Sequence, residues 1–481
     1  MNFRVVSKIL GRLLMLEGFF MGFAVIVALL YDEPDALPLL WASLITILSG
    51  LVVGFLFREK SNGFGKKEGF LVVSLSWVVF SFFGTLPFLL SHSIPSFTDA
   101  FFETISGFTT TGASILNDPE ALSHGVLVWR SITQWLGGMG IIVLSLAILP
   151  MLGIGGIQLF VAEVPGPSPD KLHPKVKETA KRLWAIYLVF TLSEVFFLLL
   201  GGMDLFDSVN HSLTTMATGG FSTKQVSIAA WPSPYIQYVI TFFMFLAGTN
   251  FTMAYFALKL KTRKVWKNEE FKVYTGFILL FTLIFTLTLS HTRDMNLGAN
   301  FRDAAFQVVS IMTTTGFVTT DYLAWVPILV VLLFMLMFFG GSAGSTGGGI
   351  KIIRVWLTMK NSYLELKRIM HPNAVIPVRY NRRAVPEKIA SNILNFIVLY
   401  MLIFIFGVLV MAILGLDMTS AMGAVAASLG NIGPGIGSVG PMDNFAHLPA
   451  FGKWFLGFLM LMGRLELFTV LLLLSPVYWR K

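Results

Sequence analysis

Apolar runs of about 20 residues recur along the whole chain, and no other feature restricts its fold as much. Each run is long enough to cross the hydrocarbon core of a bilayer, which is about 30 Å thick. Hydrophobic residues make up 55% of the 481-residue sequence and charged residues only 13%, against about 25% charged residues in a typical soluble domain. This pattern excludes a soluble enzyme and an intrinsically disordered chain. We predict an all-α polytopic membrane protein.

The apolar runs predict ten membrane spans. The first run is too long for the apolar region of a secretion signal, and no small-residue cleavage site follows it, so we expect it to be retained. The predicted spans lie at about residues 9–31, 37–57, 69–91, 126–152, 183–202, 234–258, 273–290, 325–355, 390–416 and 450–475.

The basic residues are concentrated in alternate loops. If the N-terminus and every second loop are placed on one side of the membrane, that side carries 29 of the 35 lysines and arginines. Such an excess normally marks the cytoplasmic side, so we expect both termini in the cytoplasm and an even number of spans. Since topology explains these charges, they do not indicate a nucleic-acid partner. The acidic outer side is explained equally well by attraction of cations and by simple depletion of basic residues.

The residue types needed for common active sites are missing or scattered. The sequence has no cysteine, and its seven histidines show no spacing typical of metal ligands. No paired carboxylates and no His/Asp triad lie among the apolar runs. We expect no enzyme activity, no transition-metal site and no cofactor bound by this chain.

Four segments of the chain repeat one pattern between two long apolar runs. Each has an acidic residue, about twelve helix-compatible residues and a turn of small residues around glycine. Strongly basic linkers at residues 155–182, 259–272 and 351–388 separate the copies. The segments begin at Asp99, Asp207, Asp303 and Asp417 and align on Gly112, Gly219, Gly316 and Gly433.

The short helix of each copy is the informative part. At about 1.5 Å per residue, twelve residues span about 18 Å, roughly half a bilayer, so this helix must enter from the outside and return through the following turn. Non-helical backbone at that depth is tolerated only where it is buried in protein or lines a wet cavity. Four such units around one axis bring four helix C-termini together, and their dipoles favour a cation there.

The turns have the composition of an ion-binding backbone. A desolvated alkali cation needs oxygen atoms in place of water, and backbone carbonyls supply them without net charge. Glycine permits the unusual dihedral angles that direct successive carbonyls inward, and neighbouring threonines can add hydroxyl oxygens. A single such turn means little, but four turns in register after four short helices predict a filter. The four turns are Thr109–Gly112, Met216–Gly219, Thr313–Gly316 and Gly430–Gly433.

The repeats divide the chain into five parts. Residues 1–60 would form two additional N-terminal transmembrane helices. Each of the four other parts would be a pore repeat made of a span, a pore helix, a filter loop and a second span around one pore. These pore repeats would occupy residues 61–155, 156–262, 263–365 and 366–481.

The sequence resembles the Trk/Ktr/HKT superfamily of potassium transporters, and within it most closely the bacterial TrkH branch. The resemblance covers essentially the whole chain, including the two extra N-terminal spans. It implies potassium uptake across the bacterial cytoplasmic (inner) membrane, with K⁺ as the transported ion. The motifs that carry it are TTTGAS at 109–114, ATGGFST at 217–223, TTTGF at 313–317, NIGPGIG at 431–437, GGSAGSTGGGIK at 340–351 and GRLELF at 463–468.

The resemblance implies which residues bind potassium in the filter. A serine in place of Gly112 marks sodium-preferring plant relatives, so glycine here favours potassium. The Gly219-Gly220 doublet leaves the register of the second loop open by one residue, and the fourth loop has no threonine before Gly433. The implied filter residues are Thr110, Thr111, Gly112, Ala217, Thr218, Gly219, Gly220, Thr314, Thr315, Gly316, Asn431, Ile432 and Gly433.

A glycine-rich segment interrupts the second span of the third repeat. Close helix packing through small residues is one explanation, whereas the resemblance implies an intramembrane gating loop below the filter. Arg464 lies in the last apolar run, where an ionisable side chain suggests function; it would act with this gate, or alternatively form a structural ion pair with Glu17, Glu194 or Glu466. The implied gating residues are Gly340, Gly341, Ser342, Gly344, Ser345, Thr346, Gly347, Gly348, Gly349 and Arg464.

The resemblance also implies partners, namely a second copy of the chain in a homodimer and a cytosolic nucleotide-binding subunit of the TrkA type. The basic cytoplasmic face fits such a subunit, but anionic membrane lipid explains it equally well. Transport that is channel-like and transport coupled to H⁺ or Na⁺ both remain open. The alternative function is a sodium-permeable or poorly selective monovalent-cation transporter, against which Gly112 argues.

Overall fold

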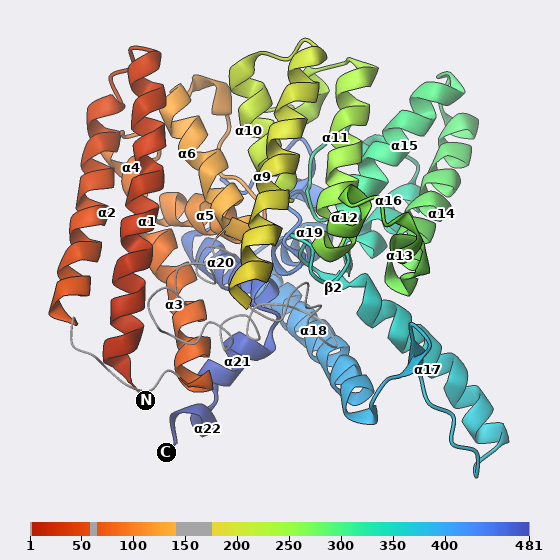
Figure 1. The fold of residues 1–481 in the computed structure, drawn as a ribbon. Coiled ribbons are helices and arrows are strands. Elements are labelled where there is room, and N and C mark those ends of the chain that lie inside the picture. The colour runs from red at the N-terminus through yellow and green to blue at the C-terminus, as the bar shows by residue number, and fades with distance from the viewer. Residues whose placement is uncertain (1, 58–64, 141–175, 481) are drawn as a thin grey trace.

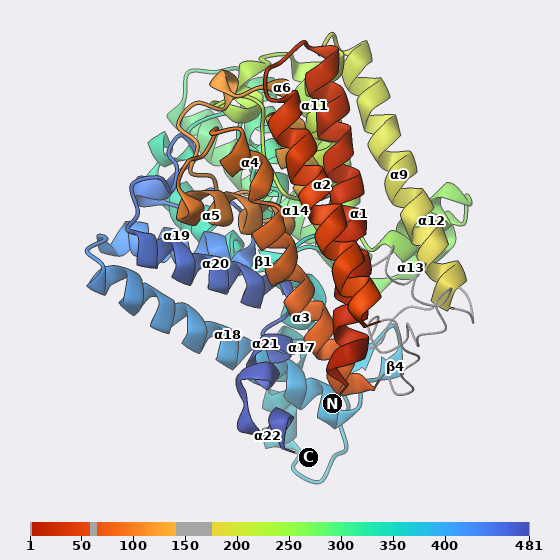
Figure 2. The same cartoon turned by 90° about the vertical axis from the view of Figure 1, so that its left-hand side faces the viewer.

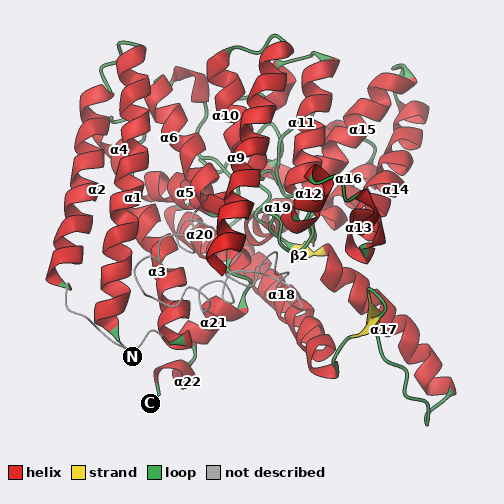
Figure 3. Cartoon of the chain, in the orientation of Figure 1, coloured by secondary structure: helices red, strands yellow, loops and turns green. Residues whose placement is uncertain are grey.

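The computed structural model describes residues 2–57, 65–140 and 176–480 as an assembly of helices around four short central ones (Figure 1). Helices dominate the described chain, and the strands are two residues long (Figure 3). Both chain termini lie at the same end of the molecule. The C-terminal part of the predicted fourth span, the linker at 155–175 and two predicted repeat boundaries lie outside the described residues.

Two long antiparallel helices form one edge of the molecule. Helix α1 spans Phe3–Leu30 and α2 spans Ala36–Leu56, and both views show them side by side (Figures 1 and 2). They touch through backbone at paired glycines: a Cβ added to Gly50 would lie 2.5 Å from the carbonyl oxygen of Gly11. Small residues let membrane helices approach this closely, which stabilises the pair by van der Waals contact.

Each of the four repeats begins with a long helix and continues with a short one. The long helices are α3 (Lys66–Phe83, extended by α4, Leu86–Leu90), α9 (Val176–Leu200), α14 (Glu269–Thr292) and α18 (Glu387–Ile413). The short helices are α5 (Phe97–Phe108), α10 (Leu205–Met216), α15 (Leu297–Met312) and α19 (Met418–Gly430). The short helices, 12 to 16 residues long, confirm the predicted half-length elements.

The second apolar run is broken in the second, third and fourth repeats, whereas the sequence predicted a break only in the third. Helix α6 (His124–Trp135) passes into a π-helical turn, η2 (Leu136–Gly140). Helices α11 (Pro234–Ala247) and α12 (Phe251–Leu258) meet at 112°, and α20 (Ala450–Arg464) and α21 (Phe468–Leu474) at 118°. In the third repeat, α16 (Pro327–Leu336) is followed by β1 (Phe339–Gly340), β2 (Ile350–Lys351) and α17 (Ile352–Met370).

Local chemistry explains two of these breaks. Asn250 starts α12 anew, because its side chain accepts a hydrogen bond from the Thr252 amide and so caps the helix. Glu466 and Leu467 adopt positive φ angles of 56° and 49°, which end the α20 helix. Within the described residues, six helices and two bent pairs are long and apolar enough to cross a membrane. The run at 325–355 is therefore not one spanning helix.

The remaining elements are short connections. They are the 3₁₀ turns η1 (Pro119–Ala121), η4 (Ser227–Ala230), η5 (Tyr322–Ala324) and η6 (Gly437–Val439), the helices α13 (Thr262–Lys267) and α22 (Pro476–Trp479), and the antiparallel hairpin of β3 (Arg379–Tyr380) and β4 (Arg383–Ala384).

Burial separates the short helices from the long ones. Residues 100–108 of α5 and 303–312 of α15 are all buried, and α10 and α19 are buried over most of their length. Outer helices expose large apolar side chains, such as Leu56 at 69% and Ile413 at 84%. The long helices therefore face lipid, and the short helices with their turns are enclosed by protein, as non-helical backbone inside a membrane requires.

We expect Gly50→Ala to weaken the α1–α2 pair, because its methyl group would meet the Gly11 carbonyl. Overpacking of this kind costs about 1–3 kcal/mol, which lowers the unfolding temperature of the purified protein in detergent. Gly54→Ala, one helical turn away, is the matched control, because a Cβ there meets no atom within 4 Å. Equal unfolding temperatures for the two variants would contradict the close glycine contact.

Candidate functional site

All four short helices end in the same backbone turn. A residue one or two positions after the helix end adopts a left-handed conformation, and a glycine two positions after that residue has positive φ. The left-handed residues are Thr110, Thr218, Thr314 and Asn431, with φ of 53°, 54°, 59° and 53°. The glycines are Gly112, Gly220, Gly316 and Gly433, with φ of 81°, 75°, 80° and 102°. Glycine adopts such angles without steric cost.

This pattern fixes the register of the second loop. The alignment on Gly219 is wrong by one residue, and Gly220 is the counterpart of Gly112. Hydrogen bonds at the ends of the short helices agree, because the Gly219 amide donates to Thr214 O just as the Thr111 amide donates to Ser106 O, both at 2.9 Å. Ala217 accordingly matches Thr109 and lies at the helix end. The glycine doublet left two registers open, and only the dihedral angles separate them.

The four loops close into a ring through backbone contacts. In each contact, a filter glycine faces the carbonyl oxygen of the residue before the glycine of another loop. A Cβ added to Gly112, Gly220 or Gly316 would lie 2.0, 1.9 or 1.9 Å from the carbonyl oxygens of Gly219, Thr315 and Ile432 respectively. A Cβ on Gly433 would lie 2.9 Å from the carbonyl oxygen of Thr111, which completes the cycle.

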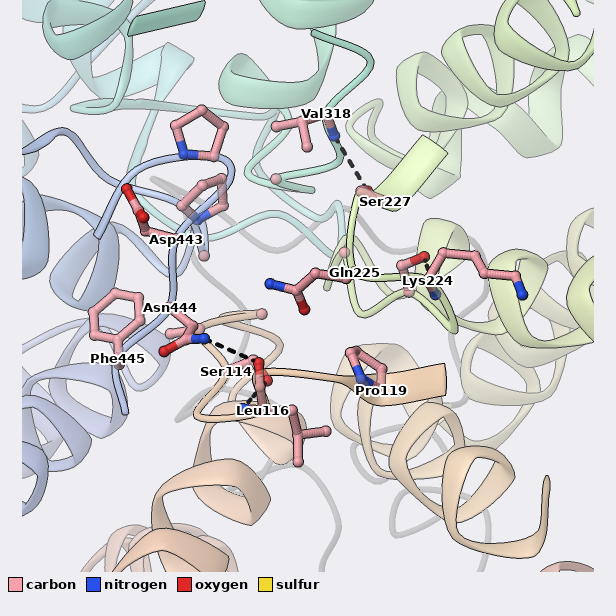
Figure 4. A pocket seen from close by; sticks show the side chains of 18 of the residues that line it. Ser114, Leu116, Pro119, Lys224, Gln225, Ser227, Val318, Asp443, Asn444 and Phe445 are labelled. Carbon is pink, nitrogen blue, oxygen red and sulfur yellow. Dashed lines mark hydrogen bonds between the residues drawn. The ribbon is translucent and has the colours of Figure 1, made fainter. Parts of the chain in front are cut away.

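A cavity of about 80 Å³ opens on one side of this ring. Gly112, Gly220, Gly316 and Gly433 line its floor, and Lys224, Gln225 and Asp443 are among the residues of its wall. In Figure 4 the amide of Gln225 points into the middle of the cavity, whereas the side chain of Lys224 points away. The loops that follow all four short helices therefore surround a vestibule over the ring.

The side chains beside the ring differ between quadrants. The hydroxyls of Thr109 and Thr111 are hydrogen-bonded to each other at 2.8 Å, and those of Thr313 and Thr315 make the same 2.8 Å contact. In the fourth loop, where the sequence has no threonine, Asn431 Nδ2 donates to Thr111 Oγ1 at 2.9 Å. The amide of Asn431 thus ties the fourth loop to the first.

A buried ion pair supports the first and second loops from behind. Arg130 Nε on α6 donates to Glu103 Oε1 on α5 at 2.6 Å, and both side chains are almost fully buried. Glu103 also accepts from the Ser114 hydroxyl at 3.0 Å, and Arg130 donates to Ser222 O at 2.7 Å. Sequence reasoning missed this pair; the signal was an acidic and a basic residue within otherwise apolar helices.

A glutamine on the same face of α6 also contacts the second loop. Gln134 Nε2 donates to Gly219 O at 2.7 Å, and Gln134 Oε1 accepts from the Phe221 amide at 3.0 Å. Arg130 and Gln134 are four residues apart and so lie on one face of α6. Together they hydrogen-bond to Gly219, Phe221 and Ser222 of this loop. No sequence signal pointed to Gln134, because nothing local links it to a turn 85 residues away.

The glycine-rich segment forms a loop whose ends are joined. Strands β1 and β2 pair in parallel, Phe339 with Ile350 and Gly340 with Lys351, which closes the loop at its base. Its tip contacts the ring on the side opposite the vestibule: the Gly348 amide donates to Thr314 Oγ1 at 2.7 Å, and Thr346 Oγ1 donates to Met216 O at 3.1 Å. The segment is therefore not an ordinary helix–helix contact.

The break between α11 and α12 anchors this loop. The Ser342 amide donates to Gly248 O at 2.8 Å, and the Phe251 amide donates to Gly344 O at 3.1 Å. The Ala343 amide donates to Glu270 Oε1 at 2.6 Å, which adds a contact from α14. Of the predicted gating residues, Gly341, Ser345 and Gly347 pack among these contacts, since a Cβ on Gly341 would lie 2.8 Å from Gly248 O.

Arg464 lies where the loop meets two other repeats. Its guanidinium donates to Thr346 O at 2.7 Å and to Gly137 O and Gly138 O at 2.6 and 2.8 Å. Glu466, one candidate partner for Arg464, forms an ion pair with Arg354 instead. The buried Lys351, which the sequence did not single out, donates from Nζ to Gly347 O, so a second basic side chain contacts the loop.

Comparisons with known protein families, sequences and structures all lead to one family. A sequence model of the TrkH family, described as "Cation transport protein", matches residues 39–481. The "Trk system potassium uptake protein TrkH" of Salmonella typhimurium and that of Escherichia coli K12 are each 42% identical to this chain over 100% of both sequences. The crystal structure of the potassium transporter TrkH from Vibrio parahaemolyticus matches with a TM-score of 0.90 at 39% identity, again over 100% of both chains. The resemblance drawn from the motifs is confirmed, and the chain belongs to the TrkH family of cation transport proteins.

Proposed function

We propose that this protein takes up potassium ions across the bacterial inner membrane through the ring formed by its four filter loops. One observation carries the proposal: four buried half-length helices end at a closed ring in which glycine backbone contacts carbonyl oxygen in every quadrant. The similar proteins of Salmonella typhimurium and Escherichia coli are named as potassium uptake proteins.

The ring has the chemistry that a desolvated cation needs. Backbone carbonyl oxygens replace water without adding net charge, and the C-terminal ends of the four short helices carry partial negative charge toward the ring. Direct contact of backbone with backbone limits how far the loops can shift. The residues proposed to bind K⁺ are those that precede and include Gly112, Gly220, Gly316 and Gly433.

The glycine-rich loop is the proposed gate. It contacts the ring on the side away from the vestibule, and Arg464 donates to its Thr346 carbonyl. A fixed positive charge in a low-dielectric passage raises the barrier for K⁺. Arg464 would therefore act both through its charge and by holding the loop in place.

Orientation and partners complete the proposal. Both termini would lie in the cytoplasm, since that side carries the excess of basic residues. The basic residues of α17 and of the β3–β4 hairpin, such as Arg382 and Arg383, would face a cytosolic nucleotide-binding subunit of the TrkA type. The working unit would be a homodimer. Uptake would be driven by the membrane potential or by coupling to H⁺ or Na⁺.

The filter proposal predicts that Gly112→Ser reduces discrimination between K⁺ and Na⁺ by roughly tenfold, equivalent to about 1.4 kcal/mol. The added side chain would collide with the Gly219 carbonyl and displace it. Uptake of both ions is measured in cells that lack other potassium systems. Gly415→Ser is the control, because Gly415 also has positive φ but a Cβ there meets no atom within 4 Å. Unchanged selectivity in Gly112, Gly220, Gly316 and Gly433 variants would refute the assignment, and poor selectivity in the unaltered protein would favour the sodium-permeable alternative.

The gate proposal predicts that Arg464→Ala increases rubidium flux into liposomes several-fold. Deletion of residues from the tip of the glycine-rich loop should act in the same direction. The two changes should combine sub-additively if both open one constriction. Loss of Arg464 also leaves three carbonyl oxygens without their donor, so unfolding temperature is measured alongside flux. Folded variants with reduced or unchanged flux would contradict the gate and favour a packing role.

The orientation proposal predicts where reporter fusions are active. Reporters fused within residues 259–267 and 360–385 should score as cytoplasmic, because these segments are basic. A reporter near residues 117–123, in the loop after the first filter turn, should score as external. An external score for a fusion near residue 365 would refute the proposed topology.

A further inference from the structure

One quadrant of the ring lacks a side chain that the others have. The residue before the filter glycine is Thr111, Thr315 or Ile432 in three loops, but in the second loop it is Gly219. The φ angle of Gly219 lies outside the left-handed region, so its backbone does not require glycine. The absence of a side chain at this position therefore has a cause outside the loop.

The side chain of Gln134 occupies the missing volume. A Cβ added to Gly219 would lie 2.4 Å from Gln134 Cδ and 2.5 Å from Gln134 Oε1, too close for both groups to fit. Gln134 itself is fully buried. Gln134 projects from α6, and its amide carbon Cδ lies close to the position that the Cβ atom of the corresponding residue takes in the other quadrants.

Gln134 also supplies the hydrogen bonds that the second loop lacks. In the first and third loops, threonine hydroxyls bond to each other beside the ring. In the second loop these positions are Ala217 and Gly219, and neither has a hydroxyl. Gln134 instead donates to Gly219 O and accepts from the Phe221 amide, so it is hydrogen-bonded to the residues on both sides of Gly220.

We propose that Gln134 is a positioning residue for ion selection, replacing from α6 the filter side chain that the second loop lacks. The inference rests on the proposed potassium filter. Gln134 hydrogen-bonds to the Gly219 carbonyl, and this carbonyl faces Gly112 of the neighbouring first loop. Two adjacent glycines have more backbone freedom than any other pair. Without the amide, this quadrant can shift toward a smaller ion, and discrimination against Na⁺ falls.

The first test separates hydrogen bonding from volume. Gln134→Met keeps a side chain of similar length but loses both hydrogen bonds, whereas Gln134→Glu keeps the acceptor for the Phe221 amide and loses the donor to Gly219 O. We expect K⁺-over-Na⁺ flux ratios in liposomes to fall by about tenfold in Gln134→Met, as expected for the loss of two buried hydrogen bonds. Gln134→Glu should also lose selectivity, because its carboxylate faces the Gly219 carbonyl.

Gln237→Ala is the matched control for these variants. Gln237 is a buried glutamine on α11 that donates to Trp231 O at 3.1 Å. It contributes the same type of side chain to the core, outside the ring, and its loss should leave the K⁺-over-Na⁺ ratio unchanged. A general packing defect would lower unfolding temperature and total flux in both variants without altering the ratio.

The second test exchanges the two groups. Gly219→Thr alone should abolish selective uptake, because the new side chain collides with Gln134. The double variant Gln134→Ala with Gly219→Thr removes that collision and restores a side chain in the loop, so selectivity should recover to well above that of either single variant. A double variant no better than the worse single variant, or wild-type selectivity in Gln134→Met, would overturn the positioning role. An unaltered protein without selective potassium flux would overturn the filter itself, and with it this inference.

Discussion

The structure depends on burying non-helical backbone in the middle of a membrane. Lipid offers no hydrogen-bond partners, so every turn at that depth must be enclosed by protein or line a water-filled cavity. Here four short helices and their turns meet at one ring, and the outer helices shield the ring from lipid. The breaks in the second helices follow from the same constraint. Their freed carbonyls, at Gly137, Gly138 and Gly248, accept hydrogen bonds from Arg464 and from the Ser342 amide.

The four quadrants share a backbone but not a set of side chains. Glu103 on α5 corresponds in position to His211 on α10, and each binds a serine of its own loop, Ser114 or Ser222. The equivalent residue on α15 is Gln307, which is buried and has no hydrogen-bond partner among the described residues. The quadrants are therefore held by different contacts: α6 hydrogen-bonds to the second loop, whereas the third loop accepts a hydrogen bond from the Gly348 amide of the glycine-rich loop.

Sequence reasoning predicted the fold class, the four short helices and the four turns that form the ring. These features follow from the length of the hydrophobic runs and from the positions of the glycines. Sequence reasoning aligned the second loop on Gly219 but left the register open by one residue, since two adjacent glycines look identical until their φ angles are known. The breaks at Asn250 and Glu466 were missed because each lies inside a run that is long and apolar on average, despite the polar residues at the break itself. Gln134 could not be found at all, since its role depends on a contact with a turn 85 residues away.

The guanidinium of Arg464 brings together carbonyls of the first and third repeats from a helix of the fourth. An assembly of four identical subunits would have to place four such cations around its axis, where like charges would repel each other strongly. A single chain with four unequal repeats can place just one. Covalent fusion of the repeats therefore permits an asymmetric arrangement beside the ring, with Arg464 supplied by one repeat and the glycine-rich loop by another.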